Sequence, residues 1–295
     1  MQKEILLFFQ NISNPVFDFI ANVSSILGEQ TILILLLSIV MYTIDKNKGF
    51  AICGSLIISL FSTGALKAIF KAPRPYTLIN EINGKRLTTA TGYSFPSGHT
   101  TGAAAMYSSL SFAIRKRKIS ILCAISILLV GISRLYLGVH WLIDVTTGLI
   151  LGIVLSMIFY PILERSAKDE NLKFKISLYF SIICSIFSIL QSILLHLNLV
   201  DIVAFAPLMK ILAFGAGGFI GICYEIKKIK FNIKGTIKQK ILRIITLIVG
   251  MLIIQTLLKL VFSENIYYIG ALIRYILIGL WLTAIFPKLF KKLFI

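Results

Sequence analysis

The sequence predicts an all-α, polytopic transmembrane bundle of about nine spans. Of its 295 residues, 57% are hydrophobic and only 14% are charged. Apolar runs of about 20 residues, long enough to cross a bilayer core of roughly 30 Å, recur along the chain. Because lipid offers no hydrogen bonds to the backbone, such runs are expected to cross as helices. We therefore expect spans at 27–44, 49–70, 97–114, 119–137, 141–161, 176–198, 207–224, 241–262 and 268–286.

The basic residues indicate the orientation of these spans. Five segments hold 20 of the 30 lysines and arginines: 45–49, 115–118, 164–175, 225–243 and the tail after Pro287. They alternate with poorly basic connections, so the positive-inside rule assigns them to the cytoplasm. The N-terminus is then outside and the C-terminus inside. This pattern accounts for the net charge of +18 without nucleic-acid binding.

The expected spans fall into regions of different character. Residues 1–26 predict an amphipathic helix in the outer interface, divided at Pro15. A core at 27–163 carries the chemistry, and the charged stretch 164–175 separates it from a four-span unit at 176–295 of unknown role. The start of the chain lacks the features of a cleavable signal. The four cysteines form no C-x-x-C pair and are expected to be buried thiols.

Six ionisable residues are expected at one depth near the outer face of this core. They come from the second span, the start of the third and the link between the fourth and fifth: Lys67, Arg74, His99, Arg134, His140 and Asp144. Ionisable groups are costly inside a membrane, so their convergence predicts a functional site. A purely structural role for His99 and His140 is the alternative. The third histidine, His196, lies outside any motif and is expected at the interface.

The residue types of this site suit a phosphate group. Lys67, Arg74 and Arg134 can cage a phosphate dianion, with arginine giving bidentate contacts to its oxygens. In PSGH, Ser97 can cap the third span, and Gly98 lets the backbone approach an anion at the helix N-terminus.

The two histidines suit covalent phosphotransfer. Asp144 follows His140 by one helical turn, so it can hold one ring nitrogen and leave the other as a nucleophile. His99 can protonate the leaving oxygen.

Three segments together resemble the signature of the type 2 phosphatidic acid phosphatase (PAP2) superfamily. KAIFKAPRP (67–75), PSGH (96–99) and SRLYLGVHWLID (133–144) match the pattern K-x6-RP, PSGH and SR-x5-H-x3-D in order and spacing. The resemblance covers roughly residues 15–161. It implies metal-independent hydrolysis at the outer face, in which His140 becomes phosphohistidine, Asp144 orients it and His99 is the general acid. Lys67, Arg74, Ser97, Gly98 and Arg134 would bind the phosphate.

The resemblance implies a lipid phosphatase in a bacterial plasma membrane, with a lipid phosphate as substrate and no cofactor. The outer loops also lack a carboxylate cluster that could hold a metal. Phosphatidic acid, phosphatidylglycerophosphate and undecaprenyl diphosphate are candidate substrates. The Lys- and Ile-rich composition fits an AT-rich bacterial genome and favours undecaprenyl diphosphate. Two alternatives stay open: a lipid phosphotransferase that uses the same site, and a lipid-binding or transport protein that retains it.

Other polar residues have two interpretations each. In the C-terminal unit, Lys210, Lys259 and Arg274 fall in the outer halves of three spans, with Asp201 and Glu264 near the same end. They either snorkel and form ion pairs or build a second anion pocket. Thr88, Thr89, Thr91 and Tyr93 contact a headgroup or simply form a polar loop. The glycine-rich segment 213–221 is expected to serve close helix packing.

Overall fold

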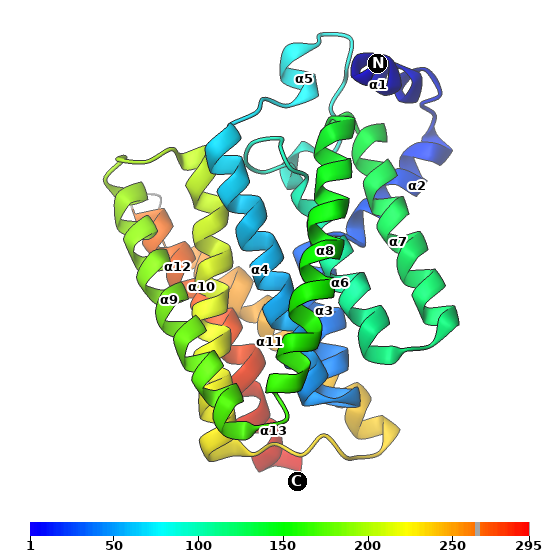
Figure 1. The fold of residues 1–295 in the computed structure, drawn as a ribbon. Coiled ribbons are helices and arrows are strands. Elements are labelled where there is room, and N and C mark those ends of the chain that lie inside the picture. Colours follow the sequence, from blue (N-terminus) through cyan, green and yellow to red (C-terminus); the bar gives the residue numbers. More distant parts are fainter. Residues whose placement is uncertain (263–265, 295) are drawn as a thin grey trace. The chain divides into compact units, whose positions relative to one another are not determined.

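The computed structural model describes residues 1–262 and 266–294, so Glu264 lies outside the described residues. Every regular element in these residues is a helix (Figure 1). The chain divides into two compact units, which we describe separately. Unit 1 comprises residues 1–36 and 51–163, and unit 2 comprises 37–50 and 164–295.

Seven helical segments are long and apolar enough to cross a membrane: Lys46–Leu78, Arg117–Tyr136, Leu142–Ser166, Glu170–His196, Ile202–Ile229, Ile237–Val261 and Tyr267–Lys292. A pair bent by 52°, Pro15–Ile26 and Gln30–Ile44, makes an eighth if it counts as one span. The remaining expected span, the third (97–114), corresponds to α6 (Gly98–Ile114), which has only 17 residues. At 1.5 Å per residue this helix is about 26 Å long, shorter than a bilayer core. The all-helical transmembrane class is confirmed, with seven to eight candidate spans.

The N-terminal segment forms two helices. α1 (Gln2–Asn11) ends before Asn14, which caps α2 (Pro15–Ile26) by accepting a hydrogen bond from the Phe17 amide at 2.9 Å. Pro15 occupies the first position of α2, where its missing N–H costs nothing. The break predicted at Pro15 is therefore present. α3 (Gln30–Ile39) follows and continues into the π-helical turn η1 (Val40–Ile44).

Unit 1 is built on α4 (Lys46–Phe70), α6, α7 (Arg117–Tyr136) and α8 (Leu142–Ser166). α6 and α7 share a core of small and branched apolar side chains that includes Ala103, Tyr107 and Val130. α8 packs closely on α6 at Gly152, where an added Cβ would lie 2.6 Å from the Cβ of Ala104. This contact fixes the start of α8 beside the start of α6.

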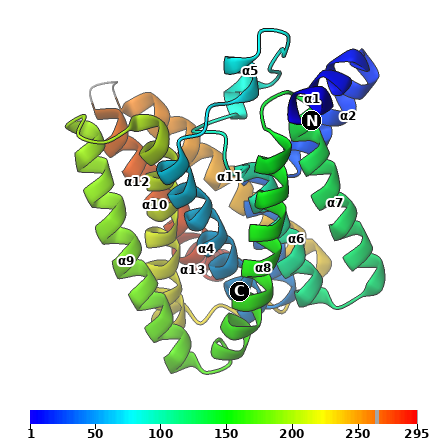
Figure 2. The same ribbon diagram turned by 45° about the horizontal axis from the view of Figure 1, so that its top comes forward.

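The ends of α6 and α7 determine where the motifs lie. The turn between them carries the basic segment 115–118, at the lower right of Figure 1. PSGH begins α6 at the other end, and Arg134 lies in the last turn of α7. The short helices α5 (Pro75–Leu78) and η2 (Leu87–Thr89) belong to the connection between α4 and α6. α5 and α1 lie at the end of unit 1 remote from the α6–α7 turn (Figures 1 and 2).

Unit 2 contains α9 (Glu170–His196), α10 (Ile202–Tyr224), α11 (Ile237–Val261), α12 (Tyr267–Leu280) and α13 (Phe286–Phe294), with π-helical turns η3 (Glu225–Ile229) and η5 (Trp281–Ile285). α10 packs against both α9 and α12 (Figure 1). The glycines of 213–221 permit this approach, because a Cβ at Gly217 would lie 2.0 Å from the Ile276 carbonyl oxygen. The packing role expected for this segment is confirmed.

The four cysteines, Cys53, Cys123, Cys184 and Cys223, are buried and form no disulfide, as the sequence predicts.

Candidate active site

The predicted site residues come from five elements that meet at one end of unit 1. Lys67 lies in the last turn of α4 and Arg74 directly precedes α5. His99 lies in the first turn of α6 and Arg134 in the last turn of α7. His140 is in the link to α8, and Asp144 is in the first turn of that helix. Residues distant in sequence are thus held by helix ends, which is how a bundle can position them rigidly.

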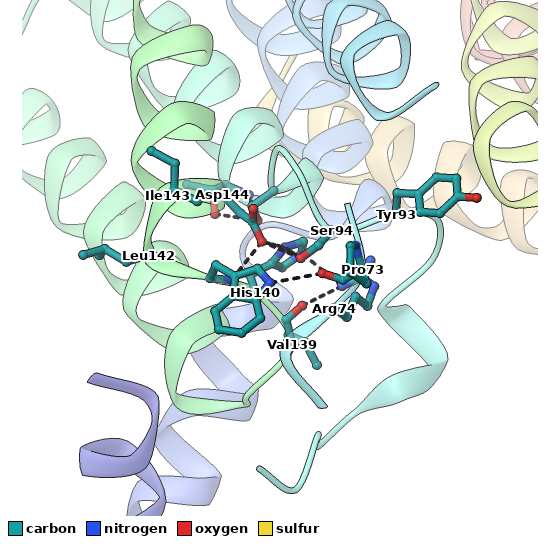
Figure 3. Close-up of polar contacts among 12 residues, drawn as sticks. Pro73, Arg74, Tyr93, Ser94, Val139, His140, Leu142, Ile143 and Asp144 are labelled. Carbon is teal, nitrogen blue, oxygen red and sulfur yellow. Dashed lines mark hydrogen bonds and ion pairs between the residues drawn. The ribbon is translucent and has the colours of Figure 1, made fainter. Parts of the chain in front are cut away.

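His140 and Asp144 form a buried pair at the centre of the site (Figure 3). The Nδ1 atom of His140 lies 3.2 Å from Oδ2 of Asp144, and the two side chains are 2% and 1% exposed. The same carboxylate oxygen accepts a hydrogen bond from the Trp141 amide at 2.8 Å. The aspartate is therefore fixed by backbone, and its position favours the imidazole tautomer with the proton on Nδ1.

Ser94 is a member of the site that the sequence reasoning missed. Its hydroxyl donates a hydrogen bond to Oδ2 of Asp144 and lies 3.4 Å from Nδ1 of His140 (Figure 3). The residue is fully buried, and its amide donates to the Ala72 carbonyl at 2.8 Å. The one sequence signal for Ser94 is that it lies just before FPSGH. The signature does not include this position.

Arg74 connects the loop before α6 to His140. Its NH1 nitrogen donates to the Val139 carbonyl at 2.8 Å and lies 3.2 Å from Nε2 of His140. Its Nε and NH2 nitrogens donate to the carbonyls of Gly92 and Thr91 at 3.1 and 2.9 Å. The guanidinium therefore holds the loop and faces the ring nitrogen opposite Asp144.

Lys67 binds the same loop from α4. Its ammonium donates to the carbonyl oxygens of Tyr93 and Ser94, the latter at 3.2 Å. Thr91 and Tyr93 thus contribute backbone carbonyls to the site. A headgroup contact by the side chains of Thr88, Thr89, Thr91 and Tyr93 stays a prediction.

Arg134 is the site cation with the most unpaired donors. It is fully buried, and NH1 donates to the Ser25 hydroxyl at 2.6 Å, but Nε and NH2 have no hydrogen-bond partner. The Nε2 atom of His99 is likewise buried and unpaired. Arg134, Arg74 and Lys67 all act electrostatically on His99. Unpaired buried donors are costly unless an anion satisfies them.

Arg86 adds a further positive charge that the sequence reasoning did not single out. It acts electrostatically on His99 and Arg134, and it pairs with Glu29.

The start of α6 is shaped by Ser97 and Gly98. Ser97 caps the helix: its hydroxyl accepts from the Thr100 hydroxyl at 2.8 Å, and its amide donates to the Asp144 carbonyl at 3.0 Å. A Cβ added to Gly98 would meet nothing within 4 Å. The helix N-terminus at Gly98 therefore adjoins open space, which lets an anion approach the first amides.

The charge balance around His140 favours a neutral ring. Burial lowers the pKa of His140 well below its ordinary value, and the nearby positive charges of Arg74, Lys67 and Arg134 lower it further. Asp144, which contacts the ring, is one negative charge against these three cations. The ring is therefore unprotonated at neutral pH, the state that a nucleophile requires.

An apolar pocket of about 390 Å³ adjoins Asp144. It is lined by Phe70, Phe95, Trp141 and Ile143, and it reaches Asp144. The rings of Phe70 and Phe95 meet edge to face with centroids 5.0 Å apart. A buried polar site thus opens beside a space suited to hydrocarbon.

Comparison with known families identifies the architecture. The model of the PAP2 superfamily matches residues 48–168, and that of the PAP2 superfamily phosphatase, transmembrane extension, matches residues 209–295. The chain belongs to the PAP2 superfamily of membrane lipid phosphatases. The PAP2 match includes Lys67, Arg74, His99 and His140, and the extension includes Lys210 and Arg274.

Individual PAP2 relatives share shorter segments with the chain. It is 37% identical over 78 residues to phosphatidylglycerophosphatase B of Bacillus subtilis, covering 23% of this chain and 38% of that protein. It is 35% identical over 92 residues to undecaprenyl-diphosphatase BcrC of the same organism, covering 31% and 46%. The crystal structure of Aquifex aeolicus LpxE aligns with a TM-score of 0.49 at 27% identity, over 54% of this chain and 94% of that one. The chain spans less than half the length of the two curated relatives.

The PAP2 site has cations where a metal-dependent enzyme has carboxylates. Across residues 1–262 and 266–294, no group of three His, Cys, Asp or Glu side chains could hold a metal ion. The positive charge available to a phosphate comes from Lys67, Arg74 and Arg134.

Proposed function

We propose that this chain is an integral-membrane lipid phosphatase that cleaves a terminal phosphate through a phosphohistidine at His140. The observation that carries the proposal is the fixed imidazole: Asp144 holds Nδ1 at 3.2 Å, and Nε2 faces the Arg74 guanidinium. A ring held in one tautomer beside cations is poised to attack an electrophilic phosphorus. A lipid phosphotransferase would use the same intermediate, with a lipid acceptor in place of water.

The reaction has two displacement steps. The Nε2 lone pair of His140 attacks phosphorus, and the bond from phosphorus to the leaving oxygen breaks with its electron pair on that oxygen. His99 donates a proton to the leaving oxygen. Water then attacks the phosphohistidine and gives a proton back to His99, which releases inorganic phosphate and restores both rings. Asp144 stabilises the charge that His140 acquires in the first step.

The phosphate oxygens would be bound by donors that are unpaired or only partly used. Arg134 offers Nε and NH2, and the N-terminus of α6 at Gly98 offers backbone amides. Lys67 and Arg74 complete the cage while they hold the outer loop. An incoming dianion offsets these cations, and this favours the protonated His99 that the leaving oxygen needs.

A lipid substrate is supported by the apolar pocket beside Asp144, which can take hydrocarbon near the phosphate. The two relatives in Bacillus subtilis are named for different lipid substrates. One is named for phosphatidylglycerophosphate and the other for undecaprenyl diphosphate. We propose undecaprenyl diphosphate as the leading substrate, ahead of phosphatidylglycerophosphate and phosphatidic acid.

The reaction is proposed to occur at the outer face of a bacterial plasma membrane. α6 and α7 each have one end at the site and the other at the basic turn 115–118. Basic connections stay in the cytoplasm. The site, at the opposite ends of the same two helices, would therefore face outward.

The test is phosphate release from a panel of the three candidate lipids in detergent micelles. We expect His140→Ala to abolish release, at least a thousandfold below wild type, because no other group can form the intermediate. The control is His196→Ala, which removes the exposed histidine at the end of α9 and should retain wild-type turnover. A binding or transport protein would release no phosphate in either form, and activity retained by His140→Ala would refute the nucleophile.

A further inference from the structure

The transmembrane extension contains two cations that share one phenol. Lys210 on α10 and Arg274 on α12 both approach the hydroxyl of Tyr267. The Lys210 ammonium lies 3.4 Å from this oxygen and 5.6 Å from the centre of the Tyr267 ring. The positive charge of Arg274 also acts on this phenol. Lys259, the third cation of this group in the sequence, is exposed on α11.

Arg274 is a buried guanidinium with an unused donor. The residue is only 6% exposed, and its Nε atom has no hydrogen-bond partner. Its guanidinium also lies 5.6 Å from the centre of the Tyr275 ring. Among the described residues, no carboxylate forms an ion pair with Arg274 or Lys210. Two positive charges therefore lie near the neutral hydroxyl of Tyr267, which cannot neutralise them.

The neighbouring helix adds neutral polar groups near this depth. Leu195 of α9 and Ala271 of α12 belong to one core cluster with Met209, the residue before Lys210. One helical turn from this cluster toward the middle of the helices, α12 carries Arg274 and α9 carries Gln191 and Ser192. The side-chain amide oxygen of Gln191 and the hydroxyl of Ser192 are buried and have no hydrogen-bond partner. Cationic and neutral hydrogen-bonding groups thus gather between helices that are otherwise apolar.

We propose that Lys210, Arg274 and Tyr267 form a second oxyanion site, which binds the phosphate of an anionic lipid headgroup within unit 2. A phosphate supplies several acceptor oxygens and the negative charge that no described carboxylate brings to the two cations, and arginine binds it with its planar fork. Tyr267 is exposed and Lys210 is half-buried, so the site is reached from the surface of the unit. The site lies outside the catalytic residues and does not depend on the proposed hydrolysis.

The test uses the full chain, delipidated in dodecyl maltoside, and measures by native mass spectrometry the lipid it retains. One arm supplies dioleoyl phosphatidylglycerol, a second supplies dioleoyl phosphatidylcholine, and a third adds inorganic phosphate as a competitor. We expect wild type to retain phosphatidylglycerol at least tenfold more than phosphatidylcholine. Arg274→Gln and Lys210→Gln should lose that preference.

Lys259→Gln is the matched control, since it removes a lysine of the same unit outside the site. We expect it to retain the wild-type preference. If phosphate competes away the lipid in wild type but has no effect on Arg274→Gln, free phosphate is also a ligand of the same groups. Equal lipid retention by wild type, Arg274→Gln and Lys210→Gln would overturn the proposal. If Arg274→Gln does not fold, the lipid preference of Lys210→Gln is the test by itself. The Lys210 side chain is half-exposed, so its replacement leaves no cavity in the protein interior.

Discussion

His140 is held from both sides, and in the proposed mechanism this arrangement couples phosphate binding to release of the nucleophile. Asp144 and Ser94 lie at Nδ1, while an Arg74 nitrogen lies 3.2 Å from Nε2. An arginine N–H directed at Nε2 occupies the lone pair that must attack phosphorus. A phosphate oxygen that takes over this N–H frees the lone pair at the moment the electrophile arrives. We infer that Arg74 both binds the phosphate and protects the ring until then.

Ser94→Ala tests the contribution of the residue outside the signature. The change removes the hydroxyl that bonds Asp144, so Asp144 and His140 lose a restraint while the phosphate cage stays intact. One hydrogen bond to a charged group is worth about 1.5 kcal/mol or more, or roughly a tenfold loss in kcat, with KM little changed. Steady-state phosphate release measures both constants.

Ser109→Ala is the control for Ser94→Ala, because it removes a buried hydroxyl of α6 that has no hydrogen-bond partner. It should keep wild-type kcat. Equal rates for the two variants would remove Ser94 from the site.

The pH dependence of kcat/KM should report the depressed pKa of His140. A histidine whose pKa is lowered stays neutral as the pH falls through its ordinary range and gains a proton only below it. The fall of kcat/KM at acidic pH that is caused by protonation of His140 should therefore lie below about pH 6.5. The ionisation of the substrate is measured separately by phosphorus NMR and subtracted. An enzyme ionisation at or above pH 6.5 in this limb would contradict the charge balance described for the ring.

At the residue scale, the sequence could predict the relation between two site residues where their spacing along one helix determines their relative positions. His140 and Asp144 are one turn apart, and PSGH begins a helix, so their relation could be predicted. Ser94 could not be, because it lies in a loop whose path depends on the hydrogen bonds from Lys67 and Arg74. Its partner Asp144 is 50 residues away.

The contact between α6 and α8 links the two helices that carry proposed catalytic residues. α6 carries His99 and α8 carries Asp144, and both belong to the first turn of their helix. An added Cβ at Gly148 would lie 2.9 Å from the Ser97 carbonyl, next to the site. One turn further along, Gly152 would meet the Thr101 carbonyl at 2.6 Å. The small residues of α8 therefore set the distance between the two helix starts.

Gly152→Ala should destabilise unit 1 through this contact. The new methyl would force the helices apart, at a cost of about 1–3 kcal/mol that outweighs the gain in helix propensity of about 1 kcal/mol. Thermal unfolding of the detergent-solubilised protein should show a lower midpoint. The control is Gly218→Ala on α10, where an added Cβ meets nothing within 4 Å, and its midpoint should be unchanged or higher. A wild-type midpoint for Gly152→Ala would mean that α8 does not require this close approach.

The elements that the sequence predicted less well are those that do not cross as straight helices. The first expected span, 27–44, belongs to a pair bent by 52°, and its partner α2 was assigned to an interfacial segment. Periodicity cannot reveal such a bend, because each half is apolar by itself. The break before Pro15 could be predicted, since proline fixes the start of a helix.

The molecule as a whole combines two regions with different sequence signals. The PAP2 core has a signature whose three parts constrain one another, so the signature residues that meet at its site could be predicted from the sequence, whereas Ser94 could not. The extension has isolated cations, and sequence alone cannot say which of them meet. Lys210 and Arg274 approach one tyrosine, whereas Lys259 is exposed on another helix. Tertiary packing, which has no local sequence pattern here, makes that distinction.

The proposed orientation predicts opposite accessibility for two loops of unit 1. Asn83→Cys places a thiol in the connection between α4 and α6, and Lys118→Cys places one beside the α6–α7 turn. In intact cells, a membrane-impermeant maleimide should label Asn83→Cys directly and Lys118→Cys only after permeabilisation. The native cysteines are buried and provide the background. The reverse pattern would put the site on the cytoplasmic side.

The most direct test of the central claim is to trap the intermediate. Wild-type protein is mixed with undecaprenyl diphosphate radiolabelled in its terminal phosphate, quenched in base to preserve phosphohistidine, and digested for peptide mapping. The account predicts acid-labile label on the peptide that contains His140, present in wild type and absent in His140→Ala. Label on His99, or turnover of the same substrate without any labelled histidine, would contradict it.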